Sequence, residues 1–136
     1  IDKMNLAALT ATLIHYLKEE AETKIPVWQM ISAKTDDLRK RAHKIASNIP
    51  INESYSIEVI ETESTIGGGS LPGETMESVG IKIIGRNPEK LTSQIRMGKS
   101  PVVSRIYDDT AIFDLRTVLP TDDVTLMKVI SENTQV

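Results

Sequence analysis

The sequence of 136 residues contains no cysteine and few aromatic residues. Without cysteine there is no disulfide bridge, no thiolate metal site and no cysteine nucleophile, which is compatible with a reducing cytoplasm. Because aromatic residues make up 4% of the chain, the core must consist mainly of Ile, Leu, Val and Met. No apolar run approaches the roughly 20 residues of a membrane-spanning helix, and no secretory signal pattern opens the chain. We therefore expect no membrane partner.

The balance of charge is slightly acidic, with a formal net charge of −3. The chain as a whole therefore does not attract nucleic acid, and such a contact requires a local basic patch. Two groups of residues qualify: Arg39-Lys40-Arg41-His43-Lys44, and Arg86, Lys90, Arg96 and Lys99. Each group either neutralises phosphates or forms a solvated surface in which Asp and Glu alternate with the cations. No aromatic residues interleave with them to stack bases.

Apolar residues at spacings of three and four predict four helices. The first begins at its N-cap Asn5 and ends near Glu20, with an apolar stripe of Leu6, Leu9, Leu13, Tyr16 and Leu17. Segment 25–31 is apolar without periodicity, and we expect it to be extended. The second helix covers 36–48, with Thr35 as its N-cap and with Leu38, Ala42, Ile45 and Ile49 facing inward. The third follows Asn87 and ends at Gly98. The fourth follows Pro120, with Val124, Met127 and Ile130 facing inward.

Alternating apolar residues predict four strands, over 55–60, 79–83, 102–107 and 111–116. The last two flank Asp108-Asp109, which predicts a tight hairpin. Because strands outnumber possible crossover helices, we predict an α+β fold, in which a mainly antiparallel four-stranded sheet forms a two-layer domain with helices packed on one face. Within it, residues 1–24 form a connecting helix and residues 25–136 form the α+β body.

The segment from Ser64 to Glu74 contains three consecutive glycines between two predicted strands. Ordering three glycines is costly, which suggests that the backbone must approach something closely or adopt positive φ. Consecutive N–H groups in such a loop can bind an anion, although no Gly-Lys-Ser/Thr follows as in a P-loop. The alternative is a flexible connection between the strands. The residues that would face a ligand are Gly67, Gly68, Gly69 and Ser70.

Two arginines lie in predicted strands and point away from the expected core. Arg105 and Arg116 either form ion pairs, such as Arg116 with Asp114 on the same face, or recognise a carboxylate or phosphate. The histidines, His15 and His43, have no partner at helical spacing, so we predict no metal site. Nothing in the spacing identifies a catalytic residue.

The glycine segment, the Arg105–Asp109 segment and the Phe113–Pro120 segment together resemble the C-terminal part of bacterial selenocysteine synthases, the L-seryl-tRNA(Sec) selenium transferases. The resemblance covers essentially the whole chain and implies the small C-terminal domain of a fold-type I pyridoxal-phosphate enzyme. It also implies a cytoplasmic homo-oligomer that converts seryl-tRNA(Sec) to selenocysteinyl-tRNA(Sec) with selenophosphate. Residues 67–70, Arg105 and Arg116 would then face the substrate or the tRNA, and the domain would pack against the cofactor domain of the same chain.

The family's cofactor-binding lysine also follows an aspartate, as Lys3 follows Asp2 here. The residues after Lys3 nevertheless resemble the family's helix downstream of the cofactor domain, so the cofactor lysine is expected upstream of this chain. The fragment alone would bind no cofactor and be inactive. Residues 75–78 depart from the proline-containing version of many members. A related pyridoxal-phosphate lyase, or a free-standing α+β binding or oligomerisation module, therefore remains an alternative.

Overall fold

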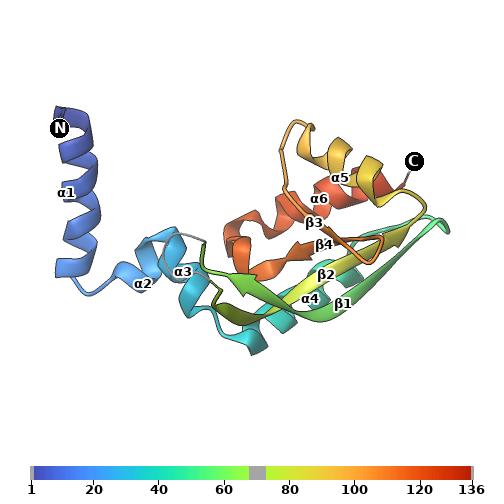
Figure 1. Cartoon of the computed structure of the whole chain (residues 1–136), viewed down its shortest axis with the longest axis horizontal. Coiled ribbons are helices and arrows are strands. Elements are labelled where there is room, and N and C mark those ends of the chain that lie inside the picture. The colour runs from blue at the N-terminus through green and yellow to red at the C-terminus, as the bar shows by residue number, and fades with distance from the viewer. Residues whose placement is uncertain (1, 68–72, 136) are drawn as a thin grey trace. The chain divides into compact units, whose positions relative to one another are not determined.

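The computed structural model describes residues 2–67 and 73–135 (Figure 1). Over these residues the chain forms two compact units, Ile1–Ala33 and Lys34–Val136, which we call the N-terminal unit and the α+β body. The N-terminal unit contains α1 (Lys3–Leu17), α2 (Ala21–Lys24) and α3 (Pro26–Ser32). The body contains α4 (Thr35–Ser47), β1 (Tyr55–Thr65), β2 (Thr75–Gly85), α5 (Pro88–Arg96), β3 (Arg105–Tyr107), β4 (Thr110–Asp114) and α6 (Asp123–Thr134). Two short 3₁₀ helices, η1 (Leu115–Thr117) and η2 (Pro120–Asp122), join β4 to α6.

Helix α1 begins earlier than predicted because Asp2, rather than Asn5, caps it. The Asp2 carboxylate accepts hydrogen bonds from the backbone N of Met4 at 2.8 Å and of Asn5 at 2.9 Å. The prediction of an extended segment over 25–31 is wrong, since Pro26 starts α3. Proline fits the first helical turn, where its missing N–H costs nothing.

The apolar stripe of α1 is not buried within this chain. Leu6, Leu9 and Leu13 are 55%, 51% and 50% exposed, and none of the described residues of α1 is buried. Apolar side chains also lie outside this stripe, where Met4 and Ile14 are exposed. A helix with apolar residues on more than one face ordinarily packs inside a larger structure.

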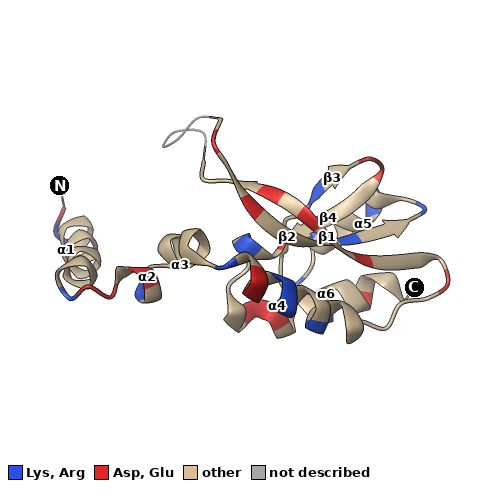
Figure 2. Cartoon of the chain, turned by 90° about the horizontal axis from the view of Figure 1, so that it is seen from below, with Lys and Arg blue, Asp and Glu red and all other residues tan. Residues whose placement is uncertain are grey.

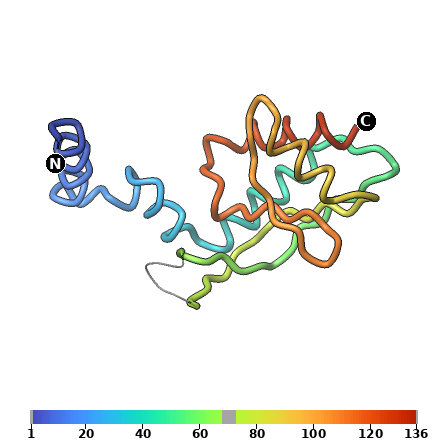
Figure 3. Tube along the Cα trace, turned by 45° about the horizontal axis from the view of Figure 1, so that its top comes forward, coloured from blue at the N-terminus to red at the C-terminus, as the bar shows by residue number. Residues whose placement is uncertain are grey.

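The sheet of the body confirms the predicted antiparallel topology, with the strand order β1-β2-β4-β3. Strands β1 and β2 form a long hairpin that can be followed in Figure 3. Both strands extend beyond the predicted ranges, through polar residues that their mutual hydrogen bonds hold in register, whereas β3 is shorter than predicted. The predicted hairpin at Asp108-Asp109 is confirmed, with φ of 47° and 57°, as a type I′ turn requires.

The core lies between one face of the sheet and helices α4, α5 and α6. Val79, Ile81 and Phe113 share that face and are 0–1% exposed. Figure 2 shows α4 and α6 along one side of the sheet. The helices contribute the buried side chains Leu38, Ala42, Ile45, Leu91, Ile95, Leu126 and Ile130.

The prediction that Val124 of α6 faces inward is wrong, because this residue is 71% exposed. The helix starts at Asp123, after η2, and its buried face is instead formed by Leu126, Val129, Ile130 and Thr134. Among the residues that the structure describes, no helix is long and apolar enough to cross a membrane.

Candidate functional site

The sheet face opposite the helices carries a buried polar group, which we call the Asp114 cluster: Ser64, Ser78, Asp114 and Arg116. The hydroxyl of Ser78 donates to Asp114 Oδ1 at 2.5 Å, and the hydroxyl of Ser64 donates to Asp114 Oδ2. The backbone N of Arg116 donates to Oδ1 at 3.1 Å. Ser64 and Ser78 are 5% and 0% exposed. A single carboxylate therefore joins β1, β2 and the start of η1.

Arg116 differs from the prediction, since β4 ends at Asp114 and Arg116 belongs to η1. The residue is 6% exposed, and its Nη2 donates to the carbonyl oxygen of Glu77 at 2.6 Å. Its link to Asp114 runs through the backbone N rather than through the predicted cross-strand arrangement. The guanidinium thus ties η1 to β2. Contact of Arg116 with a substrate stays a prediction.

Arg105 is exposed, on edge strand β3, and reaches the opposite edge strand β1. Its Nη1 donates to the carbonyl oxygen of Glu63 at 3.0 Å, and its Nη2 donates to the hydroxyl of Thr62. A cavity of about 390 Å³ lies between these strands, lined by Ile60, Thr62, Arg105, Tyr107 and Ile112 among others.

Gly80 on β2 has little free space between it and the neighbouring strands β4 and β1. A Cβ at this position would lie 3.0 Å from the carbonyl oxygen of Phe113 and 3.5 Å from the methyl group of Thr62. A side chain there would therefore push against the backbone of β4. Because Thr62 is one of the groups that hold Arg105, the missing side chain of Gly80 helps to shape the open face.

The predicted glycine site is only partly described. Gly67 has φ of +125°, and a Cβ there would have nothing within 4 Å, so backbone conformation rather than space requires glycine. Gly68, Gly69 and Ser70 lie outside the described residues. The Asp114 cluster fixes Ser64, near the end of β1 from which this segment departs.

The basic run of α4 is largely neutralised by carboxylates, which supports its interpretation as a solvated surface. Arg41 donates to both carboxylate oxygens of Asp123, at 3.0 and 2.6 Å. Arg39 pairs with Asp36 at 2.8 Å and with Glu61 at 2.7 Å. The hydrogen bond to Glu61 raises the pKa of Arg39.

The histidines do not form a metal site among the described residues, where no cluster of three potential ligands occurs. His15 lies 2.9 Å from a carboxylate oxygen of Glu20, and this hydrogen bond lowers the pKa of Glu20. His43 is exposed on α4.

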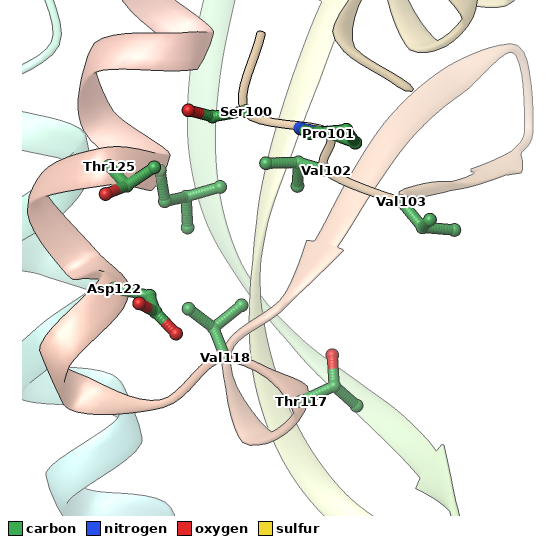
Figure 4. Close-up of a pocket in the computed structure, with 9 residues that line it drawn as sticks. Ser100, Pro101, Val102, Val103, Thr117, Val118, Asp122 and Thr125 are labelled. Carbon is green, nitrogen blue, oxygen red and sulfur yellow. The ribbon is translucent and has the colours of Figure 1, made fainter. Parts of the chain in front are cut away.

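A further cavity, of about 560 Å³, lies between the segment before β3 and the start of α6 (Figure 4). Val102 and Val118 supply apolar lining, while Asp122 and Thr125 supply polar atoms from the opposite side. No described contact links these polar groups as nucleophile and base, and the cavity suggests no reaction by itself.

The fold and the site define a small α+β domain whose polar groups mostly hold its own strands together. The chain belongs to the L-seryl-tRNA selenium transferase family, whose model matches residues 1–119. An L-seryl-tRNA(Sec) selenium transferase of Clostridium perfringens strain 13 is 35% identical over 136 residues, which cover 97% of this chain and 29% of the relative. One of Clostridium botulinum strain Hall is 36% identical over 129 residues, covering 90% of this chain and 27% of the relative. The chain therefore spans less than a third of the length of these relatives.

Sequence reasoning missed Ser64 and Ser78 as members of the site. The predicted strands 55–60 and 79–83 stop short of both serines, so neither was assigned to a strand face. Their shared carboxylate also comes from β4, which follows much later in the chain. The sequence signal for this cluster was that Asp114 lies on the same predicted strand, 111–116, as the candidate site residue Arg116.

Proposed function

We propose that this chain is the C-terminal domain of a pyridoxal-phosphate enzyme that converts seryl-tRNA(Sec) to selenocysteinyl-tRNA(Sec) with selenophosphate. The observation that carries the proposal is the family match over residues 1–119, together with relatives named as L-seryl-tRNA(Sec) selenium transferases. Because the chain corresponds to 29% of the first of these relatives, we assign the reacting groups to the remainder of the parent protein.

Pyridoxal phosphate, when bound, supplies the electron sink for chemistry at the seryl α-carbon. Lys3 does not suit the role of the lysine that holds this cofactor. It is exposed in the first turn of α1, and the neighbouring Asp2 carboxylate is committed to capping the helix. We therefore place the cofactor lysine upstream, in a part of the parent protein that this sequence does not include.

The role proposed for this chain is to pack against the cofactor domain and complete the substrate site. Exposed Leu6, Leu9 and Leu13 on α1 provide an apolar surface for this packing. Assembly of the parent into a homo-oligomer would bury more of the same helix. Both contacts would remove apolar area from water, which favours association by about 25 cal/mol per Å².

Arg105 is the residue of this chain that we propose to face the substrate, together with the glycine segment 67–70. Unlike Arg116, it is exposed, and it borders the cavity of the open sheet face. Its guanidinium is oriented by Glu63 and Thr62, and a guanidinium so held suits a carboxylate or phosphate. This role makes it a binding group rather than a proton donor.

The experiment uses the full-length parent enzyme with seryl-tRNA(Sec), selenophosphate and pyridoxal phosphate, and measures selenium incorporated into the aminoacyl-tRNA. We expect transfer, and we expect Arg105→Gln to lower kcat/KM by roughly 10- to 100-fold, the worth of about 1.5–3 kcal/mol for a charged hydrogen bond. Arg39→Gln is the matched control, because Arg39 belongs to α4, on the side of the sheet opposite the open face, where it pairs with Asp36 and Glu61 (Figure 2). This variant should retain activity.

Two results would contradict the proposal. An enzyme that ignores seryl-tRNA(Sec) but eliminates from a free amino acid would favour the related lyase. A gene without any cofactor-binding portion before this sequence would favour a free-standing module. If transfer occurs but Arg105→Gln is fully active, only the assignment of Arg105 is wrong.

A further inference from the structure

Residues 86–99 form a local basic region on an acidic chain. They contain four cations against one carboxylate, Glu89, whereas the whole chain has a net charge of −3. The cations are Arg86, Lys90, Arg96 and Lys99, and all four are exposed. We call this surface the α5 basic face, and Figure 2 shows blue segments around α5.

The cations of the α5 basic face differ from most others in the body. Arg39, Lys40, Arg41, Lys82 and Lys128 each pair with a carboxylate. No described carboxylate forms an ion pair with any member of the α5 basic face. Their charge is therefore available to an external anion.

Helix α5 is held in place by buried side chains and by an N-cap. Pro88, Leu91 and Ile95 are buried, and Asn87 caps the helix by accepting a hydrogen bond from the backbone N of Lys90 at 2.8 Å. The inward side of α5 is thus held by the core. Lys90 and Arg96 are exposed on the helix, and Arg86 and Lys99 flank its two ends. Little backbone ordering would be needed when a ligand binds.

Beside Arg96 lies a cavity of about 350 Å³, into which several hydroxyl groups are placed. Ser93 and Ser104 line it, together with Glu89. The Ser104 hydroxyl is buried and has no hydrogen-bond partner among the described residues. A cation flanked by hydroxyl donors is a combination that recurs in contacts to nucleic-acid phosphates and sugars.

We infer that the α5 basic face binds the sugar–phosphate backbone of the tRNA substrate, with Arg96 and its neighbouring cavity receiving one phosphate. The inference rests on the proposed function, since that function supplies the RNA. Residues 86–99 contain no aromatic side chain, so stacking on bases is not available and the contact does not read sequence.

The test measures binding of seryl-tRNA(Sec) to the full-length enzyme by filter retention across a series of salt concentrations. Four glutamine substitutions, at Arg86, Lys90, Arg96 and Lys99, are combined in one variant. Each lost phosphate contact should reduce the slope of log K against log salt by about 0.7–0.9. If the affinities of the two proteins converge at 1 M salt, each lost contact lowers the affinity at 0.15 M by roughly 4- to 6-fold. The combined variant, which loses four contacts, should therefore bind roughly 200- to 900-fold more weakly.

Lys44→Gln is the matched control. Lys44 is an exposed lysine of α4 outside the α5 basic face. Its substitution removes one charge, as each single substitution in the α5 basic face does, but it should leave affinity and slope nearly unchanged. Retained circular dichroism and melting temperature would show that the combined variant folds, which is expected because all four side chains are exposed. Arg96→Gln alone should cost at least as much as any other single substitution.

An unchanged salt slope in the folded combined variant would overturn the inference while leaving the proposed function intact. A parent enzyme that binds no seryl-tRNA(Sec) at any salt concentration would instead overturn the proposed function, and the inference with it. An equal loss in Lys44→Gln would show a diffuse charge effect and would also count against the α5 basic face.

Discussion

Replacing Asp114 by alanine should be among the most damaging single changes in the α+β body. The carboxylate accepts hydrogen bonds from the hydroxyls of Ser64 and Ser78 and from the backbone N of Arg116. The two serines are 5% and 0% exposed, so water cannot readily replace the lost acceptor. Leaving one buried polar group unsatisfied costs about 1–3 kcal/mol. Two such groups and the lost charged acceptor give about 3–5 kcal/mol, a large share of a typical stability of about 5–15 kcal/mol.

Equilibrium unfolding of the 136-residue chain in urea, followed by far-ultraviolet circular dichroism, measures this change. With a denaturant slope of about 1–3 kcal/mol per M, the Asp114→Ala midpoint should fall by about 1 M or more. Ser78→Ala should destabilise the native protein, but should cost little in the Asp114→Ala background, because the hydroxyl is already unsatisfied there. Additive effects of the two substitutions, or an Asp114→Ala variant as stable as the native chain, would refute this account of the cluster.

Three further changes test other parts of the body in the same assay. Arg41→Ala should cost about 1.5–3 kcal/mol, because it removes charged hydrogen bonds to Asp123 in a largely buried pair. Arg39→Ala, which removes more exposed pairs, should cost far less, and equal losses would contradict this ranking. Asp109→Gly should stabilise the chain by up to about 1 kcal/mol, since its φ is positive and glycine adopts such angles freely; a lower midpoint would count against the turn assignment. Gly80→Ala should cost about 1–3 kcal/mol through contact with the neighbouring backbone, and a neutral outcome would show that the strands can separate there.

The elements that depend on local chemistry were predictable from the sequence. Helix α5 carries its own start signals in Asn87 and Pro88, and the paired aspartates between β3 and β4 specify a two-residue turn. Helix α3 was misread because Pro26 fits equally well as the end of one element and as the first turn of another. Periodicity over seven residues is too short to decide between them.

The site depended on topology, which the sequence does not state. Ser64, Ser78 and Asp114 lie on the three strands β1, β2 and β4. They meet because β4 pairs with β2 as well as with its hairpin partner β3. Arg116 leaves the strand because the Asp114 side chain accepts from its backbone N and starts η1. The reach of Arg105 from one edge strand to the other likewise follows from the pairing order. Local alternation along a strand indicates the face on which a side chain lies, whereas the residue that it contacts depends on which strands pair.

The exposed surface of α1 has a consequence for how genetic variants are interpreted. Solvent accessibility is commonly used to forecast which positions accept charge, and by that rule Leu9, at 51% exposed, would be permissive. In the parent protein proposed above we expect the opposite ranking, with Leu9→Glu and Leu13→Glu behaving like core substitutions and lowering the amount of folded protein in cells. Deep mutational scans of the whole gene and of these 136 residues alone should therefore disagree most strongly along this one helix.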